Sequence, residues 1–211
     1  MKHIDMSTWN RREHFNVFHA MDYPHFNICA PVDISATRSV MQERGGSMNL
    51  AIVYVLARAA NDLPSFRLRI RGDTVVEHEH VRPSITVLGD EDLFSFCTIP
   101  WSSSYETFRT EAEMMMSLRQ KERVLVDEPG EDDLLFMSGI PWVAFTSIVH
   151  PIHIHPADSI PRVAWGKFAD DGAQIKLPLS VQVHHGLMDG VHVGRYFERV
   201  EELFDLAAEW L

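Results

Sequence analysis

The chain has 211 residues, enough for one sizeable hydrophobic core, and its 45% hydrophobic and 10% aromatic content excludes a disordered chain. Acidic residues outnumber basic ones by 30 to 19, and a net charge of −11 argues against binding to nucleic acid. Two isolated cysteines, Cys29 and Cys97, make no disulfide framework and favour the cytoplasm, and no apolar run is long enough for a membrane span. We expect a single domain over residues 1–211.

The first half of the chain alternates between strand and helix patterns. Thr8 is placed to cap a short helix at 9–15, and residues 26–35 form a strand pattern. Apolar residues at helical spacing predict a helix over 49–64, which Pro64 ends. Alternation of apolar residues and arginines predicts a hairpin over 66–80, with its turn at Gly72-Asp73.

The second half predicts a strand pair over 84–100 and a helix over 104–124, whose Met114 to Met116 run we interpret as core filling. Three strands follow, at 141–150, 161–170 and 173–185, and a last helix runs from about 191 to 210. Interspersed strands, hairpins and helices of this kind indicate an α/β fold, a two-layer sandwich with a mixed sheet.

The final strand ends in an unusual pair, His184-His185. Val181 and Val183 share one face, and His185 is the next residue on that face. We therefore expect His185 to point inward, where loss of solvent favours the neutral imidazole that can accept a proton. Asp189 either caps the following helix or holds the loop through a buried ion pair. Periodicity alone leaves open a plainer interpretation, in which His185 is a satisfied core histidine and Asp189 only a helix cap.

The spacing His184-His185-x-x-x-Asp189-Gly190 resembles the active-site signature of CoA-dependent acyltransferases. Further segments resemble chloramphenicol acetyltransferases in the same order and at nearly the same spacing, and the resemblance covers essentially the whole chain. These segments are "WNRREHF", "PVDIS", "ARAANDLPSFRLRI", "DLFSFCTIPWSSSYETF", "SGIPWVAFTSI" and "LPLSVQVHHGLMDGVHVGRYFERVEELF".

The resemblance implies a homotrimer with active sites at subunit interfaces, acetyl-CoA as co-substrate, and direct acetyl transfer to a hydroxyl of chloramphenicol, which inactivates the antibiotic. It implies that His185 is the general base and that Ser138 donates a hydrogen bond to the oxyanion. It also implies a structural ion pair between Asp189 and Arg11. From the residues alone, Ser138 is only a loop serine.

The resemblance further implies contacts to both substrates. Lys167 and Phe168 match residues beside the CoA nucleotide, although a lone lysine is more often a solvated charge. Phe18, Phe26 and Phe94 match an aromatic acceptor pocket, although each could equally be core. Ile148 matches a position that lines this pocket.

Several positions depart from the family pattern. Ala164 and Ser47 replace a threonine and a lysine, and Ile148 and His150 replace larger apolar groups. A second hypothesis therefore keeps the chemistry with another small hydroxylated acceptor, and a third is a non-catalytic CoA-binding homologue. A lipoyl-enzyme catalytic core is least expected, since no lipoyl segment precedes the domain. Paired histidines at 78 and 80 and at 150, 153 and 155 suggest a metal site, but no cysteine or glutamate cluster completes one, and we expect no metal.

Overall fold

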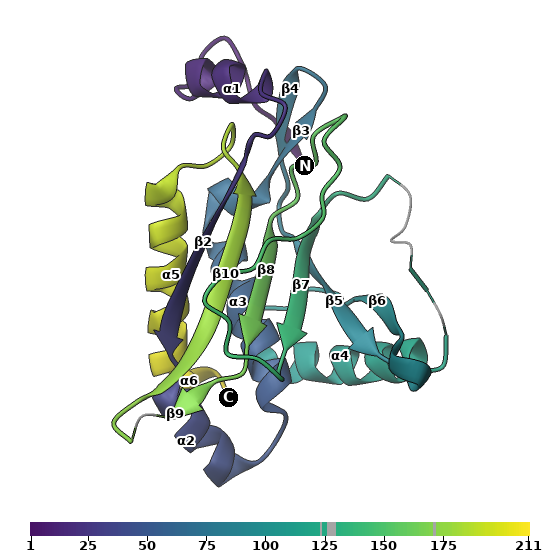
Figure 1. Cartoon of the computed structure of the whole chain (residues 1–211), viewed down its shortest axis with the longest axis vertical. Coiled ribbons are helices and arrows are strands. Elements are labelled where there is room, and N and C mark those ends of the chain that lie inside the picture. The colour runs from purple at the N-terminus through teal and green to yellow at the C-terminus, as the bar shows by residue number, and fades with distance from the viewer. Residues whose placement is uncertain (123, 126–129, 171) are drawn as a thin grey trace.

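The structure is a computed structural model that describes residues 1–122, 124–125, 130–170 and 172–211. One long twisted sheet runs through it, with helices packed behind the sheet and a smaller sheet beside α1 at one end (Figure 1). Within the described residues no helix is both long and apolar enough to cross a bilayer.

The main sheet, as far as the structure describes it, has seven strands in the order β2-β10-β8-β7-β5-β6, with the short β9 also paired to β10. β7 pairs in parallel with both β5 and β8, and the other neighbours are antiparallel, so the sheet is mixed as expected. The bounds are β2 His25–Asp33, β5 Arg82–Leu88, β6 Phe94–Thr98, β7 Leu134–Ile140, β8 Arg162–Gly166, β9 Ala169–Asp170 and β10 Ile175–His184.

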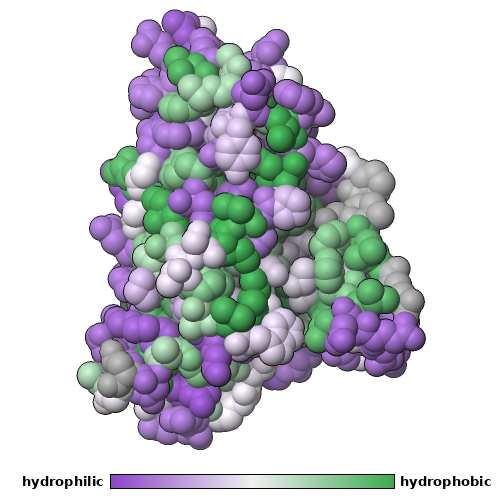
Figure 2. Space-filling model, in the orientation of Figure 1, coloured by the Kyte–Doolittle hydropathy of each residue, from purple (hydrophilic) through white to green (hydrophobic). Residues whose placement is uncertain are grey.

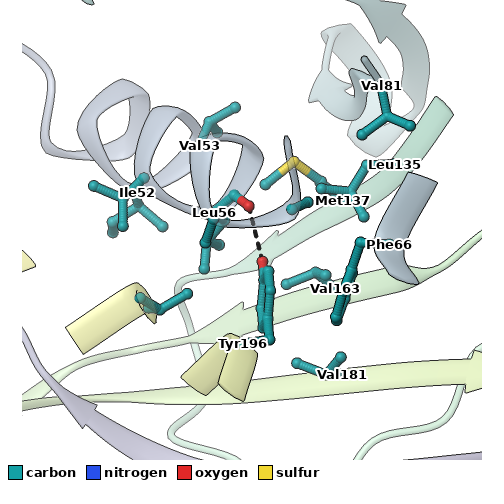
Figure 3. Packing of buried hydrophobic residues seen from close by; sticks show 14 of the residues in the cluster. Ile52, Val53, Leu56, Phe66, Val81, Leu135, Met137, Val163, Val181 and Tyr196 are labelled. Atoms are coloured by element: carbon teal, nitrogen blue, oxygen red, sulfur yellow. Dashed lines mark hydrogen bonds between the residues drawn. The ribbon is translucent and has the colours of Figure 1, made fainter. Parts of the chain in front are cut away.

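One face of the sheet packs against α3 (Met48–Asp62) and α5 (Gly190–Asp205). α3 is buried at almost every position from Leu50 to Ala60, so it is a central core helix and not an amphipathic surface helix. Tyr196 of α5 stacks on Phe66 and donates its hydroxyl to the carbonyl of Leu56 at 2.9 Å (Figure 3). This satisfied hydroxyl lies among apolar residues of the helices and the sheet.

The remaining elements lie around this core. α1 and the small sheet β1-β4-β3 lie at one end, and α4 runs below β5 and β6 (Figure 1). The bounds are β1 Lys2–His3, α1 Arg12–His19, α2 Ser35–Arg44, η1 Pro64–Arg67, β3 Leu68–Arg71, β4 Thr74–Glu77, η2 Asp90–Asp92, α4 Tyr105–Arg119 and α6 Ala207–Trp210.

Most predicted elements are confirmed. The helices at 49–64, 104–124 and 191–210 correspond to α3, α4 and α5, although α4 ends at Arg119 and residue 123 lies outside the described residues. The hairpin turns at Gly72, whose φ of 59° suits glycine. Met115 and Met116 pack against the core as predicted, whereas Met114 is exposed.

Three local predictions are wrong. Thr8 does not cap α1, which begins at Arg12, because residues 5–9 form a turn in which Asp5 accepts hydrogen bonds from Ser7. The strand at 26–35 ends at Asp33, and the helix α2 that follows was not predicted. Residues 141–150 are irregular, and the strand lies before them, in β7.

The irregular segment after β7 covers the second face of the sheet, and polar side chains of β2 and β10 hold it there. Asn27 donates to the carbonyl of Ile148 at 2.9 Å, and the backbone N–H of His150 donates to Gln182 at 2.8 Å. Because side chains satisfy these backbone hydrogen-bonding groups, the segment does not have to pair with a neighbouring strand. This explains why a strand-like sequence forms no strand.

Candidate active site

His185 lies in the turn directly after β10, between two aromatic rings. Its backbone N–H donates to the carbonyl of Pro24 at 2.7 Å. The ring of Phe18 from α1 stacks on the imidazole with centroids 3.8 Å apart and an angle of 5°, and Phe26 from β2 is tilted against it at 4.7 Å. The aromatic contacts fix the plane of the imidazole while its side chain keeps 33% of its surface exposed.

The prediction that His185 points inward is wrong, and its neighbour takes that role. Both faces of β10 are covered, so alternation did not distinguish the two histidines, and His184 is 1% exposed. Burial lowers the pKa of His184 to about 3, with the neighbouring His25 adding to the effect. The backbone N–H of Gly186 donates to Nδ1 of His184 at 3.0 Å, which assigns the ring proton to Nε2.

Asp189 connects the turn to α1 through Arg11. The guanidinium contacts the carboxylate with two hydrogen bonds, Nη1 to Oδ2 at 2.5 Å and Nη2 to Oδ1 at 3.0 Å. The same Nη2 donates to the carbonyl of His185 at 3.3 Å. The hydrogen bond from Arg11 lowers the pKa of Asp189, so the carboxylate stays ionised.

Asp189 fills both roles that the sequence left open. It is also the N-cap of α5, and its backbone N–H donates to Nδ1 of His192 at 3.0 Å. Oδ1 of Asp189 lies 3.2 Å from Nδ1 of His185, without the geometry of a hydrogen bond. One residue therefore starts the last long helix and places a negative charge beside the imidazole.

Ser138 lies elsewhere, on β7, and not in a loop as the sequence suggested. Its hydroxyl is 3.3 Å from that of Thr86 on β5. Both residues line a cavity of about 670 Å³, within the range of small-molecule sites. Its wall residues include Phe94, Phe96, Phe136, Trp142, His150, His153, Asp158 and Arg162.

The three phenylalanines predicted to line the acceptor pocket lie in two separate places, the cavity beside Ser138 and the surroundings of His185. Phe94 lines the cavity with Ser138, whereas Phe18 and Phe26 surround His185. Ile148 is not among the residues that line the cavity, but its carbonyl anchors the irregular segment of which His150 is a part.

His185 and Ser138 of one chain do not meet. The register aligns Ser138 with Ala164 on β8, and Ala164 with Ser180 on β10. Two strand spacings are about 10 Å, and five residues from Ser180 to His185 add about 16 Å along the strand, so the α-carbons lie roughly 19 Å apart. Side chains of serine and histidine are too short to bridge that separation.

The residues expected to contact CoA directly follow the C-terminal end of β8. Lys167 is exposed, and its backbone N–H donates to the carbonyl of Val143 at 2.9 Å. Phe168 is half-buried, and the guanidinium of Arg38 lies over its ring at 5.5 Å. Ser47 caps α3 by accepting from the N–H of Leu50, which is a helix role that a lysine could not fill.

Sequence reasoning missed two parts of this site. Thr86 lies beside Ser138, and the alternation of Ser84, Thr86 and Leu88 could have placed all three on one face. The Arg162–Asp158 ion pair of 2.5 Å at the cavity wall had no such signal, because Asp158 comes from an irregular segment. Across the described ranges, no group of three or more histidine, cysteine or acidic side chains is arranged to hold a metal ion.

Comparison with known proteins identifies the family. A family model described as chloramphenicol acetyltransferase matches residues 1–201. Chloramphenicol acetyltransferase 3 of Escherichia coli is 28% identical over 202 residues, which cover 95% of each chain. The chloramphenicol acetyltransferase of Bacillus pumilus is 29% identical over 212 residues, covering 100% of this chain and 96% of its own.

Solved structures agree. A chloramphenicol acetyltransferase superposes with a TM-score of 0.87 at 26% identity, covering 95% of this chain and 98% of its own. The cubic core of a pyruvate dehydrogenase complex, with a TM-score of 0.64 at 20% identity over 89% of this chain and 84% of its own, shares the fold. The chain belongs to the chloramphenicol acetyltransferase family and is an acyltransferase.

Proposed function

We propose that the protein transfers the acetyl group of acetyl-CoA to a hydroxyl of chloramphenicol, with His185 as general base. The names of its relatives support this acceptor and the family supports this donor. The observation that carries the proposal is the half-exposed imidazole of His185, fixed by Phe18 and by the Arg11–Asp189 pair. Such a ring is accessible to substrate and held in one orientation, as a general base requires.

The reaction balances without an acyl-enzyme. His185 accepts the hydroxyl proton, and the acceptor oxygen forms a bond to the thioester carbonyl carbon. Ser138 donates a hydrogen bond to the resulting oxyanion, a contribution typically worth about 2.7–4 kcal/mol. The carbon–sulfur bond then breaks, and the imidazolium returns the proton to the CoA thiolate. A positioned base contributes about 10²–10⁴-fold to such a step.

The active site is completed by a second copy of the chain, in a homotrimer. The roughly 19 Å between Ser138 and His185 within one chain supports this proposal, since the two groups must both contact the reacting atoms. Exposed hydrophobic residues support it too. Trp142, Val143 and Val149 of the irregular segment and Leu88 and Phe94 of the β5–β6 hairpin are exposed. Figure 2 shows hydrophobic residues on this side of the molecule, over the middle of the main sheet and around β5 and β6.

The donor would lie near Lys167 and Phe168, where an exposed cation and a half-buried ring suit a phosphorylated nucleotide. Ala164 is buried between Ser138 and Ser180 and has no hydroxyl. We therefore expect one hydrogen bond fewer near the oxyanion than in relatives that carry a threonine at this position. We place the enzyme in the cytoplasm, since both cysteines are free thiols.

A second candidate keeps the chemistry with another small hydroxylated acceptor. The polar cavity wall that includes His150 favours this candidate. The test is a spectrophotometric assay of thiol release from acetyl-CoA with chloramphenicol. We expect turnover that falls by about 10²-fold or more in His185→Ala. An assembled protein without turnover on chloramphenicol would favour the second candidate, and an unchanged rate in His185→Ala would exclude His185 as the base.

A further inference from the structure

His25, the first residue of β2, lies between the turn that carries His185 and the loop that leads into β8. It is buried, with 8% of its surface exposed. On one side, Nε2 of His25 lies 2.6 Å from the carbonyl oxygen of Asp158 in that loop. On the other side, its ring meets the ring of His184 edge to face, with centroids 5.1 Å apart and an angle of 75°. One side chain therefore joins two segments that are far apart in the sequence.

The contact with Asp158 determines which nitrogen of His25 carries the proton. A carbonyl oxygen only accepts, so Nε2 is the donor. Burial lowers the pKa of His25 by more than the bond to Asp158 raises it, so the ring is neutral at pH 7. Nδ1 of His25 is buried and has no hydrogen-bond partner among the described residues, which costs stability. An apolar side chain would avoid that cost, so the donor at Nε2 is the property that distinguishes this residue.

The turn on one side of His25 has little freedom to move. The carbonyl of Pro24 accepts from the backbone N–H of His185 at 2.7 Å, and the register pairs His25 with His184 across β2 and β10. Nδ1 of His184 accepts from the N–H of Gly186 at 3.0 Å. A Cβ atom at Gly186 would lie only 3.0 Å from the ring of His184, so the turn packs tightly on this ring. A shift of His25 is therefore passed on to the turn.

The loop on the other side is organised around Asp158. Its carboxylate accepts from the N–H of Ile160 at 2.8 Å and pairs with Arg162 at 2.5 Å. Its backbone N–H donates to the carbonyl of His153 at 2.9 Å, and His25 takes up its carbonyl. Every polar group of Asp158 is thus engaged. Since Asp158 and Arg162 line the cavity, His25 connects the cavity wall to the turn.

We propose that His25 is a positioning residue, which fixes the turn of His185 relative to the loop that carries Asp158. It acts through the turn and touches no reacting atom. This inference rests on the proposed function, in which His185 is the general base. In the proposed homotrimer, the His185 and the cavity of one chain serve different active sites, so His25 lies between two of them.

The test removes the donor of His25 and then restores it. His25→Leu has no donor, His25→Phe is a second variant without a donor should the first fail to fold, and His25→Gln keeps an N–H in reach of the Asp158 carbonyl. Thr37→Val is the matched control, because the buried Thr37 also donates to a backbone carbonyl, that of Phe204 at 2.6 Å, between α2 and α5.

Two measurements on the assembled protein separate positioning from stability. The first is kcat for thiol release from acetyl-CoA with chloramphenicol. The second does not depend on activity, and it is the NMR chemical shift of the Hε1 proton of His185 in protein labelled with ¹³C-histidine. The ring of Phe18, stacked 3.8 Å from the imidazole, shifts this signal by its ring current, so a displaced imidazole changes the shift.

We expect kcat to fall about tenfold in His25→Leu with KM for acetyl-CoA unchanged, and His25→Gln to recover most of this loss. The His185 signal should move in His25→Leu and stay in place in Thr37→Val. In a folded variant without the donor, an unmoved signal or an unchanged kcat would overturn the inference, as would an equal loss in His25→Gln. If the wild-type protein has no turnover, the proposed function fails, and the His185 signal alone decides whether His25 positions the turn.

Discussion

Replacing Asp189 with Asn removes the charge that holds Arg11 and, through it, the turn that carries His185. The side chains of Arg11 and Asp189 are 13% and 30% exposed. Breaking a fully buried pair costs about 3–5 kcal/mol, because it leaves one charge uncompensated. Partial exposure lets water solvate the guanidinium, so we expect the free energy of unfolding to fall by about 2 kcal/mol.

The same substitution should slow catalysis. Nη2 of Arg11 also donates to the carbonyl of His185, so a displaced guanidinium loosens the position of this proposed base. We expect kcat to fall by about tenfold or more, with a smaller change in KM, since small misplacements of a reacting group are costly.

Urea unfolding and thiol-release kinetics measure the two effects. Glu202→Gln is the matched control, because Glu202 forms an exposed ion pair with Arg199 on α5 and should change stability by less than about 0.5 kcal/mol. If Asp189→Asn destabilises no more than this control and keeps its kcat, the pair neither supports the fold nor positions His185 for the proposed chemistry.

Two further predictions concern buried groups. The folded-state pKa of His184 is about 3 against 6.5 for the free side chain, so between these values the unfolded chain binds one more proton, and the free energy of unfolding falls by about 1.4 kcal/mol per pH unit as pH is lowered. Denaturation series from pH 4.5 to 6.5 should show a shallower slope for His184→Asn, and an identical slope would contradict the assignment. Tyr196→Phe should cost about 1 kcal/mol by removing the hydrogen bond to Leu56, measured by the urea midpoint, and a neutral substitution would mean that the bond adds nothing.

The sequence predicted the regular parts of the fold well, because their signals are local. The apolar run of α3 and the Gly72 turn are set by neighbouring residues. Residues 141–150 have a strand-like composition, yet Asn27 and Gln182, far away in the chain, take up their backbone groups. Contacts of this kind leave no trace in a local pattern.

The candidate site shows the same division. The resemblance predicted the Arg11–Asp189 pair, which the structure contains. Alternation chose the wrong histidine as the buried one, since both faces of β10 are covered. The separation of Ser138 from His185 could not be seen without strand order, because Ser138 was interpreted as a loop residue and the register across β7, β8 and β10 sets the distance.

Activity of mixed assemblies, in the proposed homotrimer, would most directly test whether two copies share one active site. His185→Ala and Ser138→Ala chains with different affinity tags are unfolded together, refolded, and purified through both tags. If each site takes His185 from one chain and Ser138 from its neighbour, every doubly tagged trimer restores about one third of its sites, and activity rises far above either variant alone. Doubly tagged assemblies no more active than the separate variants would contradict the shared site.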